Sequence, residues 1–497
     1  MRTIGHFIGA GESGASPRSG DVFNPNTGAV QAKVGFGTAG TVNAAVTAAL
    51  KALPGWAGTN PQRRARVMFA FKGLIEKNMD ELAHLLSSEH GKVIADSKGD
   101  IQRGLEVVEF ACGIPHLLKG DYTEGAGPSI DIYSTRQALG VVAGITPFNF
   151  PAMIPLWKCA PAIACGNAFI LKPSERDPSV PMRIAELFIK AGLPEGILNV
   201  VNGDKEAVDT LLTDPRVRAI GFVGSSSIAE YIYATGCAHG KRVQCFGGAK
   251  NHMIVMPDAD MDQAVDALIG AGYGSAGERC MAVSVAVPVG QKTAETLMKK
   301  LIPRVESLKI GPSTDPQADY GPMVTRAHLN KVKDYVDLGI KEGAKLVVDG
   351  RNFRLQGYEK GNFMGGCLFD EVRPDMRIYK EEIFGPVLSV VRAKDYEEAV
   401  RLPSEHEYGN GVAIFTRDGD TARDFTQRVN VGMVGVNFAI PVPLAYYTFG
   451  GWKRSGFGDL NQHGPDAVRF YTKTKTVTAR WPSGIKEGAE FVIPTMK

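Results

Sequence analysis

Cys280 is the residue of this chain whose type and surroundings most directly indicate chemistry. It lies in the run Gly-Glu-Arg-Cys-Met-Ala at residues 277–282, behind a glycine-containing stretch that would let backbone approach a ligand closely. A thiol with a pKa of about 8.5 is mostly protonated at neutral pH, so a nucleophilic role needs a nearby cation, and Arg279 is adjacent. Taken alone, Cys280 could equally be a buried structural cysteine.

A second candidate group is the amide of Asn149, in the run Thr-Pro-Phe-Asn-Phe-Pro at residues 146–151. This run follows the apolar stretch 141–145, which predicts a buried strand. Asn149 is therefore expected at the carboxyl edge of a parallel sheet, where α/β sites form. There its amide could donate a hydrogen bond to an oxyanion. The alternative is an asparagine that only satisfies a turn.

Two more runs at predicted strand ends could bind a dinucleotide. Lys172 and Glu175 are three residues apart, so both could hydrogen-bond a ribose diol, and the carboxylate would repel a 2′-phosphate. Residues 222–227, Phe-Val-Gly-Ser-Ser-Ser, precede a predicted helix and offer backbone N–H groups to a phosphate. The alternatives are a solvated ion pair and an ordinary helix N-cap.

The segments that would hold these groups alternate between strand and helix patterns. Apolar runs predict strands at 140–145, 168–171, 197–201, 219–223 and 242–246. Stretches compatible with helices lie between them at 179–191, 205–212 and 227–235. A parallel sheet covered on both faces is therefore expected. A second alternating region, from 253 to about 436, predicts another α/β domain with helices at 261–273, 293–308 and 326–342.

Three other segments complete the expected organisation. Apolar residues between Arg64 and Leu86 recur at steps of three and four, which predicts one long amphipathic helix. The segments Ser129–Arg136 and Val468–Ala479 alternate polar with apolar or β-branched residues, which predicts exposed antiparallel strands. Exposed strands are usually covered by a partner subunit, so we expect a homotetramer built as a dimer of dimers.

Length and composition exclude several classes of protein. The 497 residues, at roughly 150 per domain, predict about three structural units. With 56 Lys and Arg against 53 Asp and Glu, the net charge is +3, so neither nucleic acid nor a membrane is an expected partner. Seven scattered cysteines predict reduced thiols and no metal site, and the N-terminus lacks a signal-peptide pattern, so a cytoplasmic location is expected.

Six motifs occur together in an order that resembles the aldehyde dehydrogenase superfamily over essentially the whole chain. They are T-P-F-N-F-P at 146–151, L-K-P-S-E at 171–175, F-V-G-S at 222–225, G-E-R-C at 277–280, E-E-I-F-G-P-V at 381–387 and F-G-G-W-K-R-S-G-F-G at 449–458. The resemblance implies an α/β fold with a Rossmann-type NAD-binding domain, an α/β catalytic domain and a small β oligomerisation segment. These would span 1–120 with 138–248, then 249–450, and then 121–137 with the C-terminal tail at 466–497.

The resemblance also implies roles for individual residues. Cys280 would be the nucleophile, and Asn149 with the Cys280 backbone N–H would form the oxyanion hole. Lys172 and Glu175 would hold the adenosine ribose, Ser225 the pyrophosphate and Glu382 the nicotinamide ribose. The full set of implied NAD-binding residues is Phe148, Lys172, Glu175, Gly224, Ser225, Glu382 and Phe384.

The chain departs from the family pattern in two places. Ala229 stands where the family has a second phosphate-loop glycine, so the cofactor could lie slightly differently. Hydrolytic members carry a Glu in the motif E-L-G-G-K, and here Cys245 takes its place within residues 244–252. That Glu activates water against the thioester, a contribution of roughly 10²- to 10⁴-fold. Its absence predicts slow hydrolysis, so the thiol of coenzyme A is expected to take the acyl group.

The runs G-A-K-N-H at 248–252 and R-C-M-A at 279–282 resemble the acylating methylmalonate-semialdehyde dehydrogenase subfamily in particular. Its substrates carry a carboxylate one carbon from the aldehyde, which requires a cation in an apolar pocket. Arg103 and Arg279 match its carboxylate-binding pattern. Arg103 could instead be a surface helix arginine, and Arg279 could serve chiefly to lower the pKa of Cys280.

The expected activity is therefore NAD-dependent, coenzyme A-acylating oxidation of methylmalonate or malonate semialdehyde, with loss of carbon dioxide. Propionyl- or acetyl-coenzyme A would be the product. Two alternatives stay open, namely a hydrolytic aldehyde dehydrogenase that releases a free acid and a binding protein that kept the fold without the activity. The preferred semialdehyde also stays open, because one methyl group contributes only about 1 to 3 kcal/mol of selectivity.

Overall fold

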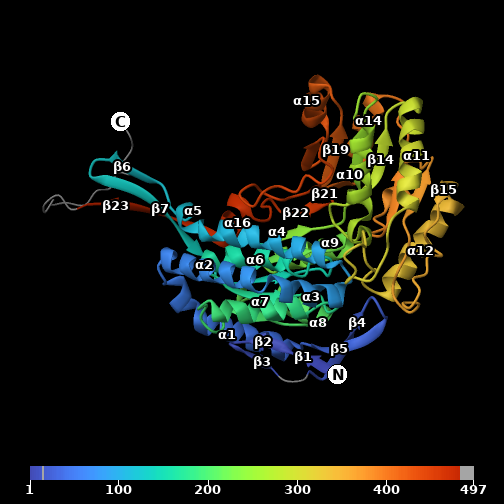
Figure 1. Cartoon of the computed structure of the whole chain (residues 1–497). Coiled ribbons are helices and arrows are strands. Elements are labelled where there is room, and N and C mark those ends of the chain that lie inside the picture. Colours follow the sequence, from blue (N-terminus) through green and yellow to red (C-terminus); the bar gives the residue numbers. More distant parts are fainter. Residues whose placement is uncertain (14–15, 482–497) are drawn as a thin grey trace.

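Two large sheets, each with its own helices, make up most of the molecule (Figure 1). The structure is a computed structural model, and it describes residues 1–13 and 16–481. The end of the expected C-terminal tail, residues 482–497, lies outside the described residues. Each sheet has its own hydrophobic core, and a smaller apolar cluster packs beside Cys280.

The first sheet is parallel at its centre and antiparallel at its two edges. Its strands, in spatial order, are β22 (Gly456–Phe457), β12 (Arg242–Phe246), β11 (Val217–Val223), β8 (Val141–Ile145), β9 (Ala168–Lys172), β10 (Leu198–Val200), β2 (His6–Ile8) and β3 (Gly11–Ser13). The five strands from β12 to β10 run parallel, and β8 and β9 are buried along their whole length. This burial explains their continuous apolar sequence.

Two groups of helices contact this sheet. The helices of the first half of the chain are α1 (Ala39–Ala57), α2 (Pro61–Lys77), α3 (Met79–His90), α4 (Ile94–Cys112), α5 (Ile114–Leu117), α6 (Met153–Ala164), α7 (Ser179–Lys190), α8 (Lys205–Thr213) and α9 (Ser226–Ala238). Helices α6 and α7 pack on the sheet and are covered by α2, α3 and α4, whereas α1, α8 and α9 contact the strands and one another. Figure 1 shows α2 and α4 on one side of α7 and α1 on the other.

The second sheet is parallel except at one edge. Its strands are β15 (Lys345–Val348), β16 (Cys367–Asp370), β17 (Val387–Val390), β14 (Val283–Pro288), β13 (Asn251–Val255), β19 (Gly411–Phe415) and β20 (Met433–Val436). Its helices are α10 (Met261–Tyr273), the 3₁₀ turn η1 (Gly274–Gly277), α11 (Gln291–Glu306), α12 (Arg326–Lys341), α13 (Arg377–Lys380), α14 (Tyr396–Glu405) and α15 (Gly419–Arg428). The helix predicted at 261–273 is confirmed residue for residue, and the predictions for α11 and α12 are confirmed within two residues.

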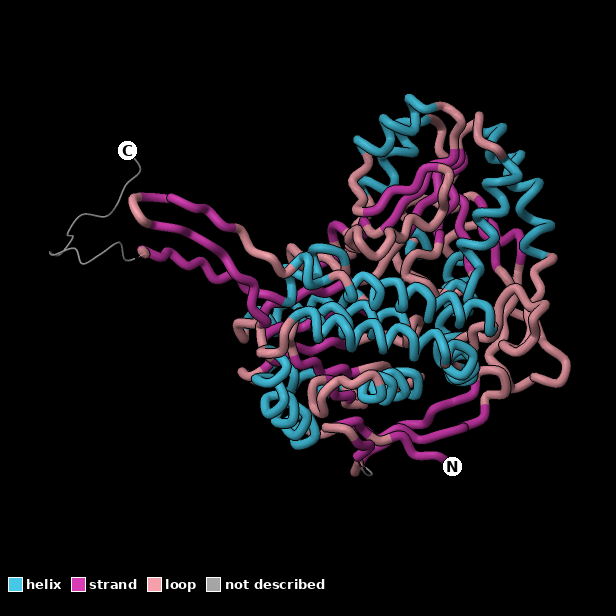
Figure 2. Tube along the Cα trace, turned by 60° about the vertical axis from the view of Figure 1, so that its left-hand side comes forward, coloured by secondary structure: helices cyan, strands magenta, loops and turns pink. Residues whose placement is uncertain are grey.

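A three-stranded arm projects from the body in both views (Figures 1 and 2). It consists of β6 (Tyr122–Gly127), β7 (Ile130–Ala138) and β23 (Thr472–Arg480), and β7 pairs antiparallel with both others. The remaining elements are a sheet of β1 (Arg2–Ile4), β5 (Ala29–Phe36) and β4 (Arg18–Asn24), a pair of β18 (Tyr408–Gly409) and β21 (Trp452–Lys453), and α16 (Gly464–Tyr471).

Two sequence predictions about single elements are wrong. The long helix expected from Arg64 to Leu86 is two helices, because Asn78 leaves helical geometry and its side-chain amide donates back to the Leu74 carbonyl at 2.7 Å. Apolar spacing continues across the break, since both helices pack on the same core. The strand expected from Val468 begins only at Thr472, because residues 464–471 form α16 and bury their apolar side chains.

The order of the strands explains how distant motifs can meet. Strands β8, β9 and β11 are neighbours and parallel, so the motifs that follow them lie at one edge of the first sheet. Strand β12 leads through residues 247–250 directly into β13 of the second sheet. Among the described residues, no helix is both long enough and apolar enough to cross a membrane.

Candidate active site

A strained loop between α10 and β14 carries Cys280. Ser275 and Ala276 have left-handed backbone angles, with φ of 55° and 52°, which residues other than glycine rarely adopt. At Gly277, φ is 72°, and an added Cβ would lie 2.1 Å from the Gly385 carbonyl oxygen. The position therefore requires glycine. This close contact fixes the Cys280 loop against the loop that carries Glu382 and Phe384.

Two side-chain amides hold the backbone carbonyl of Cys280. Asn251 Nδ2 donates to the Cys280 carbonyl at 3.0 Å and to the Ala282 carbonyl at 2.9 Å, and Asn410 Nδ2 donates to the Cys280 carbonyl at 3.1 Å. Asn251 Oδ1 in turn accepts from the Gly411 backbone N–H. Cys280 is thus attached to the first residue of β13 and to the residue that precedes β19, two adjacent strands of the second sheet.

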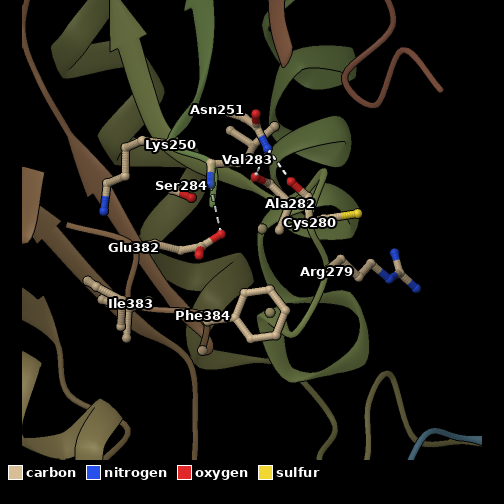
Figure 3. A pocket seen from close by; sticks show the side chains of 15 residues that line it. Lys250, Asn251, Arg279, Cys280, Ala282, Val283, Ser284, Glu382, Ile383 and Phe384 are labelled. Atoms are coloured by element: carbon tan, nitrogen blue, oxygen red, sulfur yellow. Dashed lines mark hydrogen bonds between the residues drawn. The ribbon is translucent and has the colours of Figure 1, made fainter. Parts of the chain in front are cut away.

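Figure 3 shows the pocket around this loop, where the Cys280 sulfur points away from the side on which Glu382 lies. Next to Cys280 and Phe150 is an apolar cluster formed by Val107, Met153, Ile154, Trp157, Val223, Phe246, Met281, Met433, Ala445 and Phe449. These side chains come from both sheets and from α4 and α6. They form an apolar environment beside the thiol that suits a short carbon chain.

Asn149 is buried immediately before Phe150 of this apolar cluster, with an exposed fraction of 3%. Its side-chain amide makes no hydrogen bond with any described residue. An amide donor without a protein partner can serve an oxyanion at no cost to another contact. The structure therefore fits the predicted function of Asn149 better than the alternative of a turn residue.

Lys92 is the cation that acts on the Cys280 thiol. Burial and, to a smaller extent, the Glu382 carboxylate raise the pKa of Cys280 to about 12, although Lys92 acts in the opposite direction. The Lys92 ammonium is fully buried, pairs with Asp100 at 3.1 Å and lies 3.7 Å from the centre of the Phe150 ring. Arg279 was the cation expected, as one alternative, to lower the pKa of Cys280. In the structure its guanidinium pairs with Asp96 at 2.7 Å.

The carboxyl edge of the parallel strands in the first sheet has groups that fit a dinucleotide. Lys172 Nζ and Glu175 Oε2 are 3.2 Å apart at the end of β9, so ammonium and carboxylate can reach one diol. Ser225 is the N-cap of α9, whose side chain makes no capping hydrogen bond, and Gly224 precedes it. The 13-residue helix α9 begins three residues after β11, at the same edge of the sheet, and a helix N-terminus at this place suits a phosphate.

Glu382 lines the pocket of Cys280. Its Oε1 accepts from the Ala249 backbone N–H at 3.0 Å, and burial raises the pKa of Glu382 to about 7. An added Cβ at Gly248 would lie 2.8 Å from Glu382 Oε2, so only glycine allows the strand connection to pass this close. The structure thus brings Glu382 to the pocket of Cys280, from a position 102 residues later in the sequence.

Phe148 and Phe384 contact each other. Their ring centres are 5.9 Å apart in an edge-to-face arrangement, although they come from different sheets. Phe384 has a left-handed φ of 61°, and its carbonyl lies 2.7 Å from His328 Nε2 of α12. The two rings therefore join the β8 loop to the loop of Glu382.

Cys245, the residue in place of the hydrolytic glutamate, lies on β12 and is fully buried in the core of the first sheet. Its nearest charged neighbour is Lys158 on α6, and burial holds the pKa of Cys245 at about 12. No disulfide joins any of the seven cysteines. Among the described residues, no group of three or more His, Cys, Asp or Glu could hold a metal ion.

The two predicted substrate arginines both contact α4. Arg103 belongs to α4, and it pairs with Glu106 at 2.7 Å and donates to the carbonyls of Val442 and Pro443, where Val442 borders the apolar cluster. Arg279 pairs with Asp96 in the first turn of α4. The alternative of a solvated surface arginine does not describe Arg103, whose side chain is 30% exposed and fixed at three points.

Four residues of this site escaped the sequence analysis, namely Lys92, Asp96, Asn251 and Asn410. Asn251 belongs to the G-A-K-N-H run, but nothing in the sequence predicts that it contacts Cys280, which lies 29 residues later. Asp96, Asp100 and Arg103 recur at steps of four and three, so they share one helix face. That spacing of charged residues could have indicated that Asp96 lies on the same helix face as Arg103.

Fold and site together define a class of protein, an oxidoreductase with two α/β units, a cysteine on the loop that leads into β14, and groups that suit a dinucleotide at the carboxyl edge of the first sheet. Residues 12–477 match the model of the aldehyde dehydrogenase family, so the chain belongs to that family. It is 57% identical to malonate-semialdehyde dehydrogenase of Pseudomonas aeruginosa over 497 residues, all of both chains. It is 47% identical to the acylating, mitochondrial methylmalonate-semialdehyde dehydrogenase of Arabidopsis thaliana, over 96% of this chain and 78% of that one.

Solved structures give the same result. A proposed methylmalonate-semialdehyde dehydrogenase from Sinorhizobium meliloti 1021, complexed with NAD, is 66% identical with a TM-score of 0.97, over 98% of this chain and 99% of that chain. The methylmalonate-semialdehyde dehydrogenase from Oceanimonas doudoroffii is 56% identical with a TM-score of 0.96, over 97% and 99%. The family and the α/β fold expected from the six motifs are therefore confirmed.

The raised pKa of Cys280 predicts how the free enzyme reacts with iodoacetamide. Because the thiolate fraction stays small below a pKa of about 12, the alkylation rate should rise about tenfold per pH unit from pH 7 to 9. Stopped-flow quenching followed by mass spectrometry of the Cys280 peptide measures this rate. A plateau with a midpoint near pH 7 would contradict the prediction, and the Cys280→Ala variant is the control for other thiols.

Proposed function

We propose that this protein catalyses the NAD-dependent, coenzyme A-acylating oxidation of malonate or methylmalonate semialdehyde. The observation that carries this proposal is Cys245, which stands where hydrolytic relatives have their general base and whose side chain is buried in the core of the first sheet. Without a carboxylate at that position, water is a poor acceptor for the acyl group. A thiol that ionises more readily is the better acceptor.

The relatives support the proposed substrate. The similar protein of Pseudomonas aeruginosa is a malonate-semialdehyde dehydrogenase, and that of Arabidopsis thaliana is an acylating methylmalonate-semialdehyde dehydrogenase. The comparison with the Pseudomonas aeruginosa protein spans all 497 residues of this chain, and that with the Arabidopsis thaliana protein spans 96% of it. The second candidate is a hydrolytic aldehyde dehydrogenase. It would need a carboxylate to activate water, and Glu382 is the carboxylate whose charge acts on the pKa of Cys280. That carboxylate already accepts from the Ala249 N–H.

In the proposed cycle, the Cys280 thiolate adds to the aldehyde carbon. Lys92 favours the ionised thiol, and the Asn149 amide and the Cys280 backbone N–H stabilise the oxyanion that forms. The fixed carbonyl of Cys280 keeps that N–H and the thiol in one orientation. The apolar cluster excludes water from the adduct, which strengthens these polar contacts.

Bound NAD⁺ supplies the hydride acceptor, and the adduct becomes a thioester on Cys280. We propose that Lys172, Glu175, Gly224, Ser225, Glu382, Phe148 and Phe384 hold this cofactor. The carboxylate β to the thioester carbonyl can then leave as carbon dioxide, because its electron pair passes into that carbonyl as an enolate, which takes up a proton. The coenzyme A thiolate then attacks the acyl carbon, the Cys280 thiolate leaves, and propionyl- or acetyl-coenzyme A is released.

We propose that Arg103 and Arg279 bind the substrate carboxylate. Arg103 contacts Val442 at the border of the apolar cluster, and Arg279 lines the pocket of Cys280. A carboxylate in such surroundings needs charge-assisted hydrogen bonds. Each guanidinium has five N–H donors, so the ion pairs with Glu106 and Asp96 leave donors for a ligand.

We also propose the division into domains given by the family resemblance, with NAD bound by residues 1–120 and 138–248, catalysis by 249–450, and oligomerisation by 121–137 and the C-terminal segment. A cytoplasmic homotetramer is part of the same proposal. The arm of β6, β7 and β23 supports it, because β6 and β23 are the outer strands of the arm and most of their residues are exposed.

Product analysis tests the proposed acyl acceptor. With malonate semialdehyde, NAD⁺ and coenzyme A, we expect acetyl-coenzyme A and NADH in equal amounts, measured by liquid chromatography and absorbance at the NADH band. Without coenzyme A, a single burst of NADH should be followed by turnover at least tenfold slower, because the thioester waits for its acceptor. Free acid formed at the same rate with and without coenzyme A would support the hydrolytic alternative.

The substitution Arg103→Leu tests the proposed carboxylate site. It should raise the KM for malonate semialdehyde at least tenfold and change the KM for propanal less than twofold, because propanal has no carboxylate to bind. Initial rates of NADH formation measure both values. An equal effect on the two aldehydes would mean that Arg103 only supports the loop at Val442 and Pro443.

Light scattering tests the proposed assembly. At micromolar concentration, the protein should have about four times the mass of one chain. A variant that lacks residues 472–497 should lose this mass, because it exposes β7 without its paired strand. A full-length protein that stays monomeric would contradict the proposal.

A further inference from the structure

Helix α4 presents a line of three charged side chains to the site. Asp96, Asp100 and Arg103 lie four and three residues apart, so they share one face over about two helical turns, or roughly 10 Å. Asp100 pairs with Lys92 at 3.1 Å, and Arg103 reaches the loop at Val442. Asp96 is the member of this line to which neither the motifs nor the proposed cycle gives a function.

Asp96 determines where the Arg279 guanidinium lies. Its Oδ1 accepts from Arg279 Nη2 at 2.7 Å, and both side chains are mostly buried, with exposed fractions of 17% and 22%. The guanidinium also lies against Gly274, where an added Cβ would come within 2.6 Å of Nη1. In Figure 3 the Arg279 side chain extends to the same side of the loop as the Cys280 sulfur.

The pairing between Asp96 and Arg279 uses only part of each group. It occupies one nitrogen of the guanidinium, and no other hydrogen bond of the Arg279 side chain forms with the described residues. Asp96 Oδ2 is buried and has no hydrogen-bond partner among the described residues. A planar guanidinium recognises a carboxylate well only when its plane is fixed, because two parallel N–H groups must meet two oxygens.

We propose that Asp96 is the positioning residue for Arg279 and thereby a determinant of specificity for aldehydes that carry a carboxylate. It acts through Arg279 by holding one edge of the guanidinium and leaving the other edge toward the substrate. This inference rests on the proposed binding of the substrate carboxylate by Arg279. It requires no contact between Asp96 and the substrate, whose negative charge Asp96 would repel.

The same helix offers a matched comparison. Lys98 pairs with Asp80 at 2.6 Å, but Asp80 is 76% exposed and neither residue lines the pocket of Cys280. Exposed ion pairs of this kind contribute little. The substitution Asp80→Ala therefore removes an ion pair of α4 without disturbing either arginine.

The test measures the rate of the NADH burst in a single turnover, with malonate semialdehyde and with propanal, each below saturation. For Asp96→Ala we expect about a tenfold loss with the semialdehyde and less than a twofold change with propanal, because only the bidentate contact is lost. Asp96→Asn should lie between wild type and Asp96→Ala, since an amide oxygen can still accept from Arg279. Asp80→Ala should match wild type.

A double-mutant cycle then separates positioning from general support of the fold. Arg279→Ala should lose the same selectivity, and Asp96→Ala should add less than twofold in that background, because its effect needs the guanidinium. Equal losses with both aldehydes, or a full tenfold added to Arg279→Ala, would overturn the proposal. Thermal unfolding and quenching of tryptophan fluorescence by NAD⁺ identify variants that fail to fold.

The outcome is independent of the acyl acceptor. The burst reports the steps up to hydride transfer, so it is the same for transfer to coenzyme A and for hydrolysis. If the product is a free acid, the proposed function fails while the result for Asp96 stands. If the product is an acyl-coenzyme A and Asp96→Ala affects both aldehydes equally, only the inference about Asp96 fails.

Discussion

The backbone carbonyl of Cys280 accepts hydrogen bonds from two side-chain amides, and the rest of the site depends on this attachment. Asn251 begins β13 and Asn410 directly precedes the adjacent strand β19, so Cys280 is held to the second sheet although it lies on a loop. The strain at Ser275 and Ala276 and the close approach at Gly277 are the cost of this position. These hydrogen bonds fix the position of Cys280 relative to the strands of the second sheet.

Burial determines the charges of the site as much as the residue types do. The same low-polarity surroundings raise the pKa of Cys280 and of Glu382, and they lower the pKa of Lys250 to about 7. Lys92 is the buried cation that favours the thiolate, and its own charge is balanced by Asp100. The Cys280 thiol is only partly buried, and a nearby ammonium favours its ionised form.

Helix α4 connects the Cys280 loop with the two arginines that we propose bind the substrate carboxylate. Its face places an acid for Arg279, an acid for Lys92 and a guanidinium within one line of side chains. Both arginines are already paired with carboxylates, so the pocket has little net positive charge to attract anions in general. Selectivity must then come from the direction of hydrogen bonds, which depends on how firmly each guanidinium is held.

The sequence by itself determined the family and the two α/β units, and it singled out Cys280 as the candidate nucleophile. These follow from local patterns: apolar runs that end in polar loops, and motifs such as Thr146–Pro151 whose spacing is fixed along the chain. Local patterns missed the break at Asn78, because helical spacing of apolar residues continues through it. They also placed the start of β23 too early, because Val468 and its neighbours fit a helix as well as a strand.

Only the tertiary structure decided which groups meet. Lys92 and Cys280 are 188 residues apart, Asp96 and Arg279 are 183 apart, and Asn410 reaches Cys280 from 130 residues later. No periodicity connects such positions, because contact between them depends on how two sheets and α4 pack. The sequence could name an arginine beside the cysteine, but only the packing of α4 against the Cys280 loop turned that arginine toward Asp96 and left Lys92 as the cation acting on the thiol.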